Sequence, residues 1–290
     1  TVPQNLIKLF NWISAYRNTG TPLAERKLED RKTDLYFAKK TDLGHIQDLK
    51  IKVDEKLIDN ISPNDENLYL NLENPLQSGQ SKEISLQYVL LLPHRKFTGY
   101  GKDNEELELK YFFIVPDSFE DEKLSPKNYL DIEESQNVNS FWNIQFEIPK
   151  DYQVQSNLNK KNENAFEGFA RSDAEFIITK KPMTVFQTVV DGNLIETLFH
   201  HPLTPEEKEH LEFYLPLHLQ FIKNKIGWLP EKIFITEKFK KKEDFLGIQD
   251  IKFWKFKFQL FTNKEKTDLD YYSVISKKVL HPFITKKKKK

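Results

Sequence analysis

The sequence predicts a mainly β protein, with an antiparallel sandwich or saddle first and an α+β segment after it. Over roughly the first 200 residues, hydrophobic side chains recur at every second position in several short runs. Asn, Gly, Pro and Ser separate these runs, and few long helical patterns lie among them. At residue 204 the pattern changes to that of a capped helix. The first part of the chain is therefore all-β in character.

The predicted strands follow one another along the chain. In the first, Leu49, Ile51 and Val53 alternate with charged residues. Alternation with period two is typical of a strand that buries one face. The same pattern recurs in the segments 68–72, 84–92, 107–115 and 142–148.

The segment LPHRKFTGYG lies between the two most regular of these strands, 84–92 and 107–115. Pro93 removes a backbone donor and ends the first strand. Gly99 and Gly101 permit positive φ where the chain must turn back. We therefore predict that this segment is the bend of a hairpin.

Within this bend, Tyr100 is assigned a structural role together with the glycines beside it. The basic side chains His94, Arg95 and Lys96 allow two interpretations. They form a solvated loop, which is the interpretation we favour, or an anion-binding tip.

A helix is predicted from residue 204. Thr204 as N-cap, Pro205 at the first helical position and Glu207 three residues after the cap form a capping box. Gly227 ends the helix, and Pro216 is expected to kink or divide it. The residues expected on its apolar face are Leu211, Leu215, Leu219 and Ile222.

Beyond the helix, the sequence predicts strands at 232–236 and 253–261 and the start of a helix at 268–280. We place a domain boundary near residue 203, which gives the domains 1–203 and 204–290.

Composition excludes several classes of function. Lys plus Arg and Asp plus Glu are both 44, so no net charge favours nucleic acid or an acidic membrane as the partner. The absence of Cys excludes disulfides, thiolate zinc sites and cysteine nucleophiles. No stretch approaches the ~20 apolar residues of a membrane span. The GxSxG, GxxxxGK[ST] and GxGxxG motifs are also absent.

The remaining candidates for chemistry are histidines near the predicted helix. His210 and His218 lie about 80° apart around a helix axis, which places them poorly for a shared metal. Glu206 stands where an HxxEH motif would need its first histidine. We interpret His210, His218 and the pair His200 and His201 as interdomain polar contacts.

Several blocks of the sequence resemble the aminopeptidase N-like (M1, gluzincin) zinc metallopeptidases, and more closely the divergent members from Bacteroidetes. They are NWISAYRNTGTPLAERKLEDRKTDLYFAK, LQYVLLLPHRKFTGYG, LKYFFIVPDSF, LDIEESQNVNSFWNIQFEIP and LEFYLPLHLQFIKNKIGWLPEKIFIT. The resemblance implies that 1–203 is most of an N-terminal β-saddle domain without its first strands. It also implies that 204–290 is the truncated start of a thermolysin-like catalytic domain.

In this family an HExxH helix holds zinc through its two histidines. The counterpart here reads KKVLH, with Lys277 and Lys278 in place of the first ligand and the catalytic Glu, and His281 in place of the second ligand. A lysine ammonium has no lone pair for a metal, and its charge repels a cation. We therefore predict no catalytic residue and no cofactor in this chain, with His281 as a vestigial metal ligand. The alternative is that the zinc helix follows residue 290.

We thus expect a fragment of an M1 aminopeptidase-like protein that shapes a substrate cleft and does not hydrolyse peptides by itself. The alternative is a non-enzymatic β-sandwich that binds proteins or peptides through its aromatic residues. The expected partners are peptides or the remainder of its own catalytic domain, and not nucleic acid. The first residues show no secretory signal, and the resemblance alone favours a periplasmic or secreted location.

Overall fold

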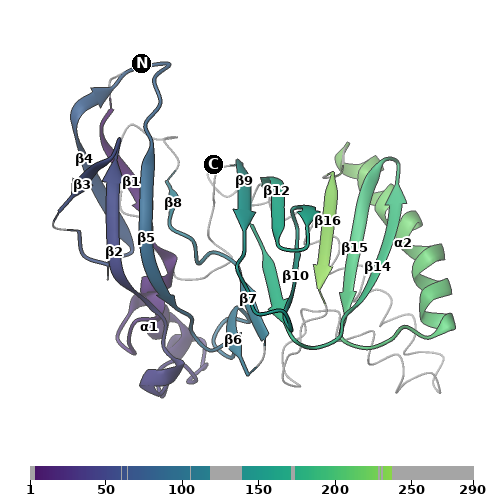
Figure 1. Ribbon diagram of the computed structural model, residues 1–290. Coiled ribbons are helices and arrows are strands. Elements are labelled where there is room, and N and C mark those ends of the chain that lie inside the picture. The colour runs from purple at the N-terminus through teal and green to yellow at the C-terminus, as the bar shows by residue number, and fades with distance from the viewer. Residues whose placement is uncertain are drawn as a thin grey trace. The chain divides into compact units, whose positions relative to one another are not determined.

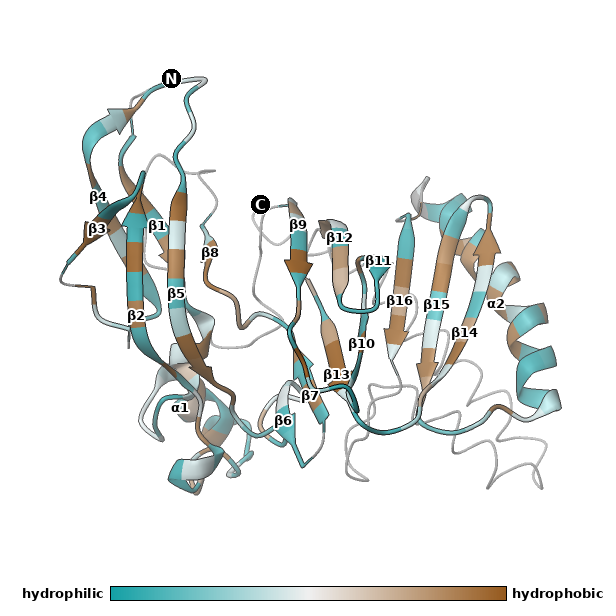
Figure 2. Ribbon diagram, in the orientation of Figure 1, coloured by the Kyte–Doolittle hydropathy of each residue, from teal (hydrophilic) through white to brown (hydrophobic). Residues whose placement is uncertain are grey.

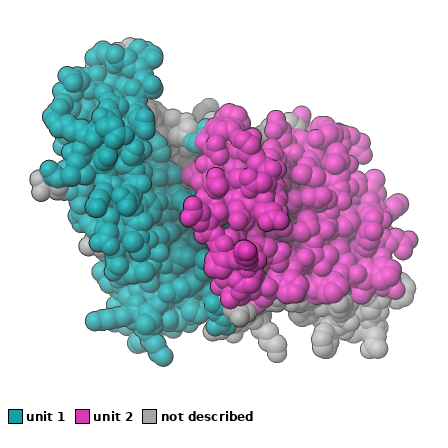
Figure 3. All heavy atoms as spheres, viewed as in Figure 1, with its two compact units in different colours: residues 1–140, 170–177 teal, residues 141–169, 178–290 magenta. Residues whose placement is uncertain are grey.

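The computed structural model describes residues 4–59, 61–63, 65–104, 106–117, 139–170, 174–227, 229 and 231–236. The chain divides into two compact units, coloured separately in Figure 3. The first comprises Thr1–Ser140 and Ala170–Ile177, and the second comprises Phe141–Phe169 and Ile178–Lys290. The strand predicted at 253–261 and the helix predicted at 268–280 lie outside the described residues.

The first unit is built from short strands and three short helices (Figure 1). Two of its sheets have the strand orders β4-β1-β8 and β3-β2-β5, and β6 and β7 form an antiparallel hairpin. The elements are β1 (Gln4–Phe10), η1 (Trp12–Tyr16), α1 (Pro22–Glu29), η2 (Lys40–Asp42), β2 (His45–Val53), β3 (Lys56–Ile58), β4 (Asn67–Leu76), β5 (Ile84–Leu91), β6 (Gly101–Asp103), β7 (Glu106–Leu109) and β8 (Val115–Pro116).

The second unit contains two three-stranded sheets, with the orders β11-β12-β9 and β14-β15-β16. The chain passes between the units inside β9, β12 and β13. The elements from β9 onwards are β9 (Ser140–Gln145), β10 (Gln153–Ser156), β11 (Asn159–Asn162), β12 (Ala165–Ala170), β13 (Phe176–Thr179), β14 (Thr184–Val190), β15 (Asn193–Phe199), α2 (Pro205–Ile226) and β16 (Lys232–Thr236).

The predicted fold class, mainly β with antiparallel sheets, is confirmed. Strands β2 and β5 pair antiparallel, and hydrophobic and hydrophilic residues alternate along them (Figure 2). Strands β15 and β16 pair parallel, and α2 connects them. A parallel pair needs such a crossover. The boundary at 203 and the thermolysin-like domain after it remain predictions.

The predicted hairpin between 84–92 and 107–115 is wrong. Strand β5 pairs with β2, whereas β7 pairs with β6, so the two predicted strands belong to different sheets. The second predicted strand is also divided, because β7 ends at Leu109 and Tyr111 has a φ of 63°. A non-glycine residue in this left-handed region interrupts a strand.

Helix α2 begins and ends as predicted. Thr204 Oγ1 accepts a hydrogen bond from the backbone N–H of Glu207, and the Glu207 side chain accepts one from the Thr204 N–H. Gly227 ends the helix at a φ of 88°. Pro216 lies inside the helix without dividing it. Of the described helices, none is long and apolar enough to cross a membrane.

The core of the second unit lies between α2 and one face of the β14-β15-β16 sheet. The predicted apolar face of α2 is buried there. Strands β14 and β15 are joined at Asp191 and Gly192, whose φ values of 49° and 82° suit a tight hairpin turn. The buried cluster contains Phe186, Val190, Ile195, Phe199, Leu211, Leu215, Leu219, Ile222, Leu229, Ile233 and Ile235.

Candidate functional site

The residues predicted to mark the zinc motif, Lys277, Lys278 and His281, lie outside the described residues. Their role therefore remains a prediction. Within the described part of the chain, no three His, Cys, Asp or Glu side chains gather in a way that could hold a metal ion.

Two of the histidines around α2, His201 and His210, have different neighbours. His201 Nε2 lies 3.6 Å from Oε1 of Glu207, the carboxylate of the capping box, and its ring packs edge-on against Phe199. The ring centroids of His210 and Tyr214, which lies one turn further along the helix, are 4.4 Å apart. These contacts connect the end of β15 with α2 and stack side chains along the helix.

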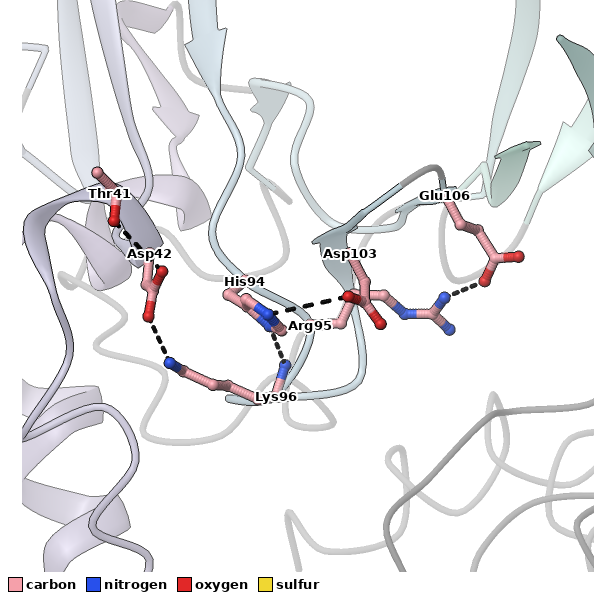
Figure 4. Close-up of polar contacts among 7 residues, drawn as sticks. All are labelled: Thr41, Asp42, His94, Arg95, Lys96, Asp103 and Glu106. Carbon is pink, nitrogen blue, oxygen red and sulfur yellow. Dashed lines mark hydrogen bonds and ion pairs between the residues drawn. The ribbon is translucent and has the colours of Figure 1, made fainter. Parts of the chain in front are cut away.

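The basic loop singled out in the sequence is an ion-pair cluster (Figure 4). The Arg95 side chain is only 10% exposed, and its guanidinium pairs with Glu106 and Glu108 of β7, with a distance of 2.7 Å to Glu108 Oε2. Burial opposes the charge of Arg95, but the two carboxylates outweigh it and raise the pKa of the guanidinium. Arg95 is thus committed to internal partners.

The neighbours of Arg95 are also paired with carboxylates. Lys96 Nζ forms an ion pair with Asp42 of η2, and His94 Nε2 lies 3.9 Å from Asp103 Oδ1 (Figure 4). The backbone N–H of His94 donates to the Asp42 carbonyl at 2.8 Å. Within this cluster the carboxylates outnumber the Arg and Lys side chains. The solvated-loop interpretation is therefore wrong for Arg95, whereas Lys96 is exposed and His94 is half-buried. The carboxylates around the loop do not favour the anion-binding interpretation.

The Asp42–Lys96 pair makes a pH-dependent contribution to stability. The hydrogen bond from Lys96 lowers the pKa of Asp42 below its ordinary value of about 3.9. A lowered carboxyl pKa stabilises the fold above the unfolded-state pKa, and this stabilisation is lost as the pH falls through the folded-state pKa. We expect Asp42→Asn to lower the melting temperature at neutral pH but not at strongly acidic pH. Lys96→Gln should remove the same pH dependence, and a pH-independent effect of Asp42→Asn would contradict this assignment.

Two glycines shape the loop, as the sequence predicts. Gly99 and Gly101 have φ values of 86° and 123°. A side chain at Gly101 would collide with the carbonyl oxygen of Pro93, which accepts a hydrogen bond of 2.8 Å from the backbone N–H of Lys102. Gly101 therefore allows two backbone segments to approach closely.

Gly79 provides a matched control for this close approach, because it has a φ of 83° and nothing within 4 Å of an added Cβ. We expect Gly101→Ala to destabilise the protein by about 1–3 kcal/mol more than Gly79→Ala, the typical cost of overpacking. Urea denaturation of both variants measures this difference. Equal losses would show that backbone conformation alone requires glycine at Gly101.

Tyr100 contributes to a second cluster in the same unit. Lys110 Nζ lies 3.2 Å from Glu175 Oε2 and 5.4 Å and 5.2 Å from the ring centroids of Tyr100 and Tyr111. Burial opposes the charge of Lys110, but Glu175 and the two tyrosines outweigh it and raise the pKa of the ammonium well above its usual value. Tyr100 therefore packs beside a buried ion pair, and the hairpin to which the sequence assigned it does not form.

The second unit holds a buried lysine, Lys232, at the start of β16. Its Nζ donates to the carbonyl oxygens of Ser156 and Leu158 at 2.8 and 2.9 Å, and lies 3.3 Å from Glu196 Oε1. Gln187 Nε2 donates to the same carboxylate at 2.8 Å. Burial lowers the pKa of Lys232 despite the nearby Glu196 carboxylate. Periodicity in the sequence did not identify this group, because Lys232 reads only as the first residue of an apolar strand.

All these clusters join segments of the chain to one another. Arg95, Lys110 and Lys232 are each the cationic centre of one such cluster.

Neither a family model nor a curated protein matches the chain. Among solved structures, an M1 zinc metallopeptidase from Deinococcus radiodurans is similar, with a TM-score of 0.50 and 10% identity over 83% of this chain and 50% of that chain. An aminopeptidase N family protein from Idiomarina loihiensis aligns with a TM-score of 0.41 and 10% identity over 81% of this chain and 34% of that chain. The chain thus spans about half the length of the Deinococcus protein. At this identity the likeness is one of fold, and the chain has the fold of part of an M1 zinc metallopeptidase.

Proposed function

We propose that this chain is the N-terminal part of an M1 aminopeptidase-like protein of the divergent Bacteroidetes type. It acts as a scaffold that shapes a peptide cleft and is not a peptidase by itself. The observation that carries the proposal is the fold likeness over 83% of the chain to an M1 zinc metallopeptidase. The resemblance of several sequence blocks to the family agrees with this proposal.

Zinc chemistry of the HExxH type does not fit the segment KKVLH. Hydrolysis in the family needs two imidazoles and a carboxylate in the HExxH pattern, and the sequence resemblance aligns Lys277 and Lys278 with two of these three positions. Two ammonium groups disfavour a dication in the same place. No step of peptide hydrolysis is therefore assigned to these residues.

The described residues support the scaffold role through their buried ion pairs. Arg95 fastens the loop after β5 to β7, and Lys232 fastens β16 to the carbonyls of Ser156 and Leu158. A buried charge that faces an opposite charge favours one arrangement of its segment, because separating the two leaves a buried charge uncompensated. A surface that shapes a cleft needs such fixed loops.

An aminopeptidase assay tests the proposal. The purified chain, supplied with zinc, is incubated with the 4-nitroanilides of leucine and alanine, and we expect no release of nitroaniline above the buffer rate. Turnover that His281→Ala abolishes would overturn the proposal. Tight binding of intact peptides, with no cleavage, would favour the alternative, a non-enzymatic peptide-binding module.

A further inference from the structure

The ring of His94 contacts its surroundings through both of its nitrogens (Figure 4). Nδ1 accepts a hydrogen bond of 3.1 Å from the backbone N–H of Lys96, two positions further along the chain. Nε2 lies 3.9 Å from Oδ1 of Asp103 on β6. Asn and Asp side chains close turns by the same contact with the backbone two residues on. The His94 ring therefore closes a turn over residues 94–96.

The hydrogen bond from Lys96 requires a neutral ring. A ring nitrogen accepts a hydrogen bond only while it carries no proton, and neutral imidazole has one donor and one acceptor nitrogen. With Nδ1 as the acceptor, Nε2 carries the proton and faces the Asp103 carboxylate. The His94 side chain is 34% exposed, so water can deliver a second proton to it.

Charged groups from two other elements lie near this ring. Asp103 of β6 faces Nε2. The hydrogen bond from Lys96, and more weakly the charges of Lys96 and His94, lower the pKa of Asp42 on η2, so this carboxylate lies within electrostatic reach of the ring. The neighbouring cations are Arg95, Lys96 and Lys102. A charged ring would thus find its opposite charge at Asp103, on the side away from the Lys96 N–H.

We propose that His94 is a pH-sensitive switch in the loop between β5 and β6: protonation of its ring breaks the hydrogen bond from Lys96 and leaves the ring paired with Asp103. A protonated imidazole has two N–H donors and no acceptor, so neither orientation of the ring can accept from the Lys96 N–H. Histidine ordinarily gains its second proton as the pH falls from 8 to 5. This inference does not rest on the proposed function.

The rest of the loop does not depend on the His94 ring. The backbone N–H of His94 donates to the Asp42 carbonyl at 2.8 Å, and the Lys102 N–H donates to the Pro93 carbonyl at the same distance. Both bonds join backbone groups, which do not titrate. The response to acid should therefore be confined to the turn at 94–96, and the Lys102 amide provides an internal reference.

Amide hydrogen exchange measured by NMR on the full chain tests this assignment. The protection of the Lys96 amide, corrected for the intrinsic effect of pH on exchange, should fall about fivefold between pH 8 and pH 5. This is the effect of losing one ordinary hydrogen bond. The protection of the Lys102 amide should stay constant over the same range.

Three variants identify the titrating group. His94→Asn places an amide oxygen where Nδ1 stands, so the turn should persist and the protection of Lys96 should be the same at both pH values. His45→Asn removes the other histidine of the first unit and should leave the response of Lys96 intact. Asp103→Asn should move the response to lower pH, because its neutral amide no longer attracts the charged ring.

Equal protection of the Lys96 amide at pH 8 and pH 5 in the wild type would overturn the inference. A pH response that persists in His94→Asn, or one that His45→Asn removes, would equally overturn it. A joint fall in the protection of Lys96 and Lys102 would assign the effect to opening of the whole loop, which also contradicts a switch at His94.

Discussion

Replacement of Arg95 by methionine is expected to lower the free energy of unfolding by about 3–5 kcal/mol, the cost of breaking a buried ion pair from one side. Methionine keeps much of the length of the side chain but removes the guanidinium. The carboxylates of Glu106 and Glu108, whose side chains are each 2% exposed, then remain buried beside each other without it. Urea denaturation followed by tryptophan fluorescence measures the loss.

Two comparisons isolate the buried charge. Arg26 pairs with Glu29 at 3.3 Å and with Asp30 at 3.5 Å, but its side chain is 46% exposed, so Arg26→Met should cost less than about 1 kcal/mol. Adding Glu106→Gln and Glu108→Gln to Arg95→Met should recover part of the lost stability. If Arg95→Met is as mild as Arg26→Met, the cluster is not the anchor of this loop.

The second large effect is expected at Lys232. Lys232→Met removes the ammonium from Glu196, whose side chain is 7% exposed, and the donor from the carbonyls of Ser156 and Leu158. We expect a loss of about 3–5 kcal/mol in the free energy of unfolding. Glu196→Gln in the Lys232→Met background should restore part of it, since the amide carries no charge to bury.

Lys223 provides the matched control in the same unit. It pairs with Asp191 at 3.2 Å, but both side chains are about a third exposed or more, at 31% and 46%. Lys223→Met should therefore change stability by less than about 1 kcal/mol. A loss at Lys232 no larger than this would contradict the assignment of Lys232 as a structural anchor of β16.

Local patterns in the sequence predicted those elements that local physics determines. Alternation predicted the strands β2, β4, β5 and β9, because each buries one face. Thr204 and Glu207 predicted the start of α2, because a capping box depends on residues three positions apart.

The same patterns failed where distant residues determine burial. Alternation placed Glu108 on an exposed face of a strand, yet Glu108 is buried because Arg95 pairs with it. The partner of β5 could not be read from the turn signals after it, because β2 lies earlier in the chain. Pairing between distant segments has no local signature.

For the candidate site, the sequence provided one hypothesis that the described residues leave open, the degenerate KKVLH motif. It also directed attention to the loop with Arg95, although with the wrong role. The sequence of a basic run does not reveal whether carboxylates lie near it in space. Only the fold could show that Arg95 belongs to an internal ion-pair cluster.

The zinc content of the purified chain bears on the whole proposal. The chain is dialysed first against zinc and then against metal-free buffer. Elemental analysis should then find far less than one zinc per chain in the wild type. The variant Lys277→His with Lys278→Glu, which restores the HExxH pattern, should retain more zinc than the wild type. One tightly held zinc per wild-type chain, lost on His281→Ala, would contradict the assignment of this chain as a scaffold without a metal site.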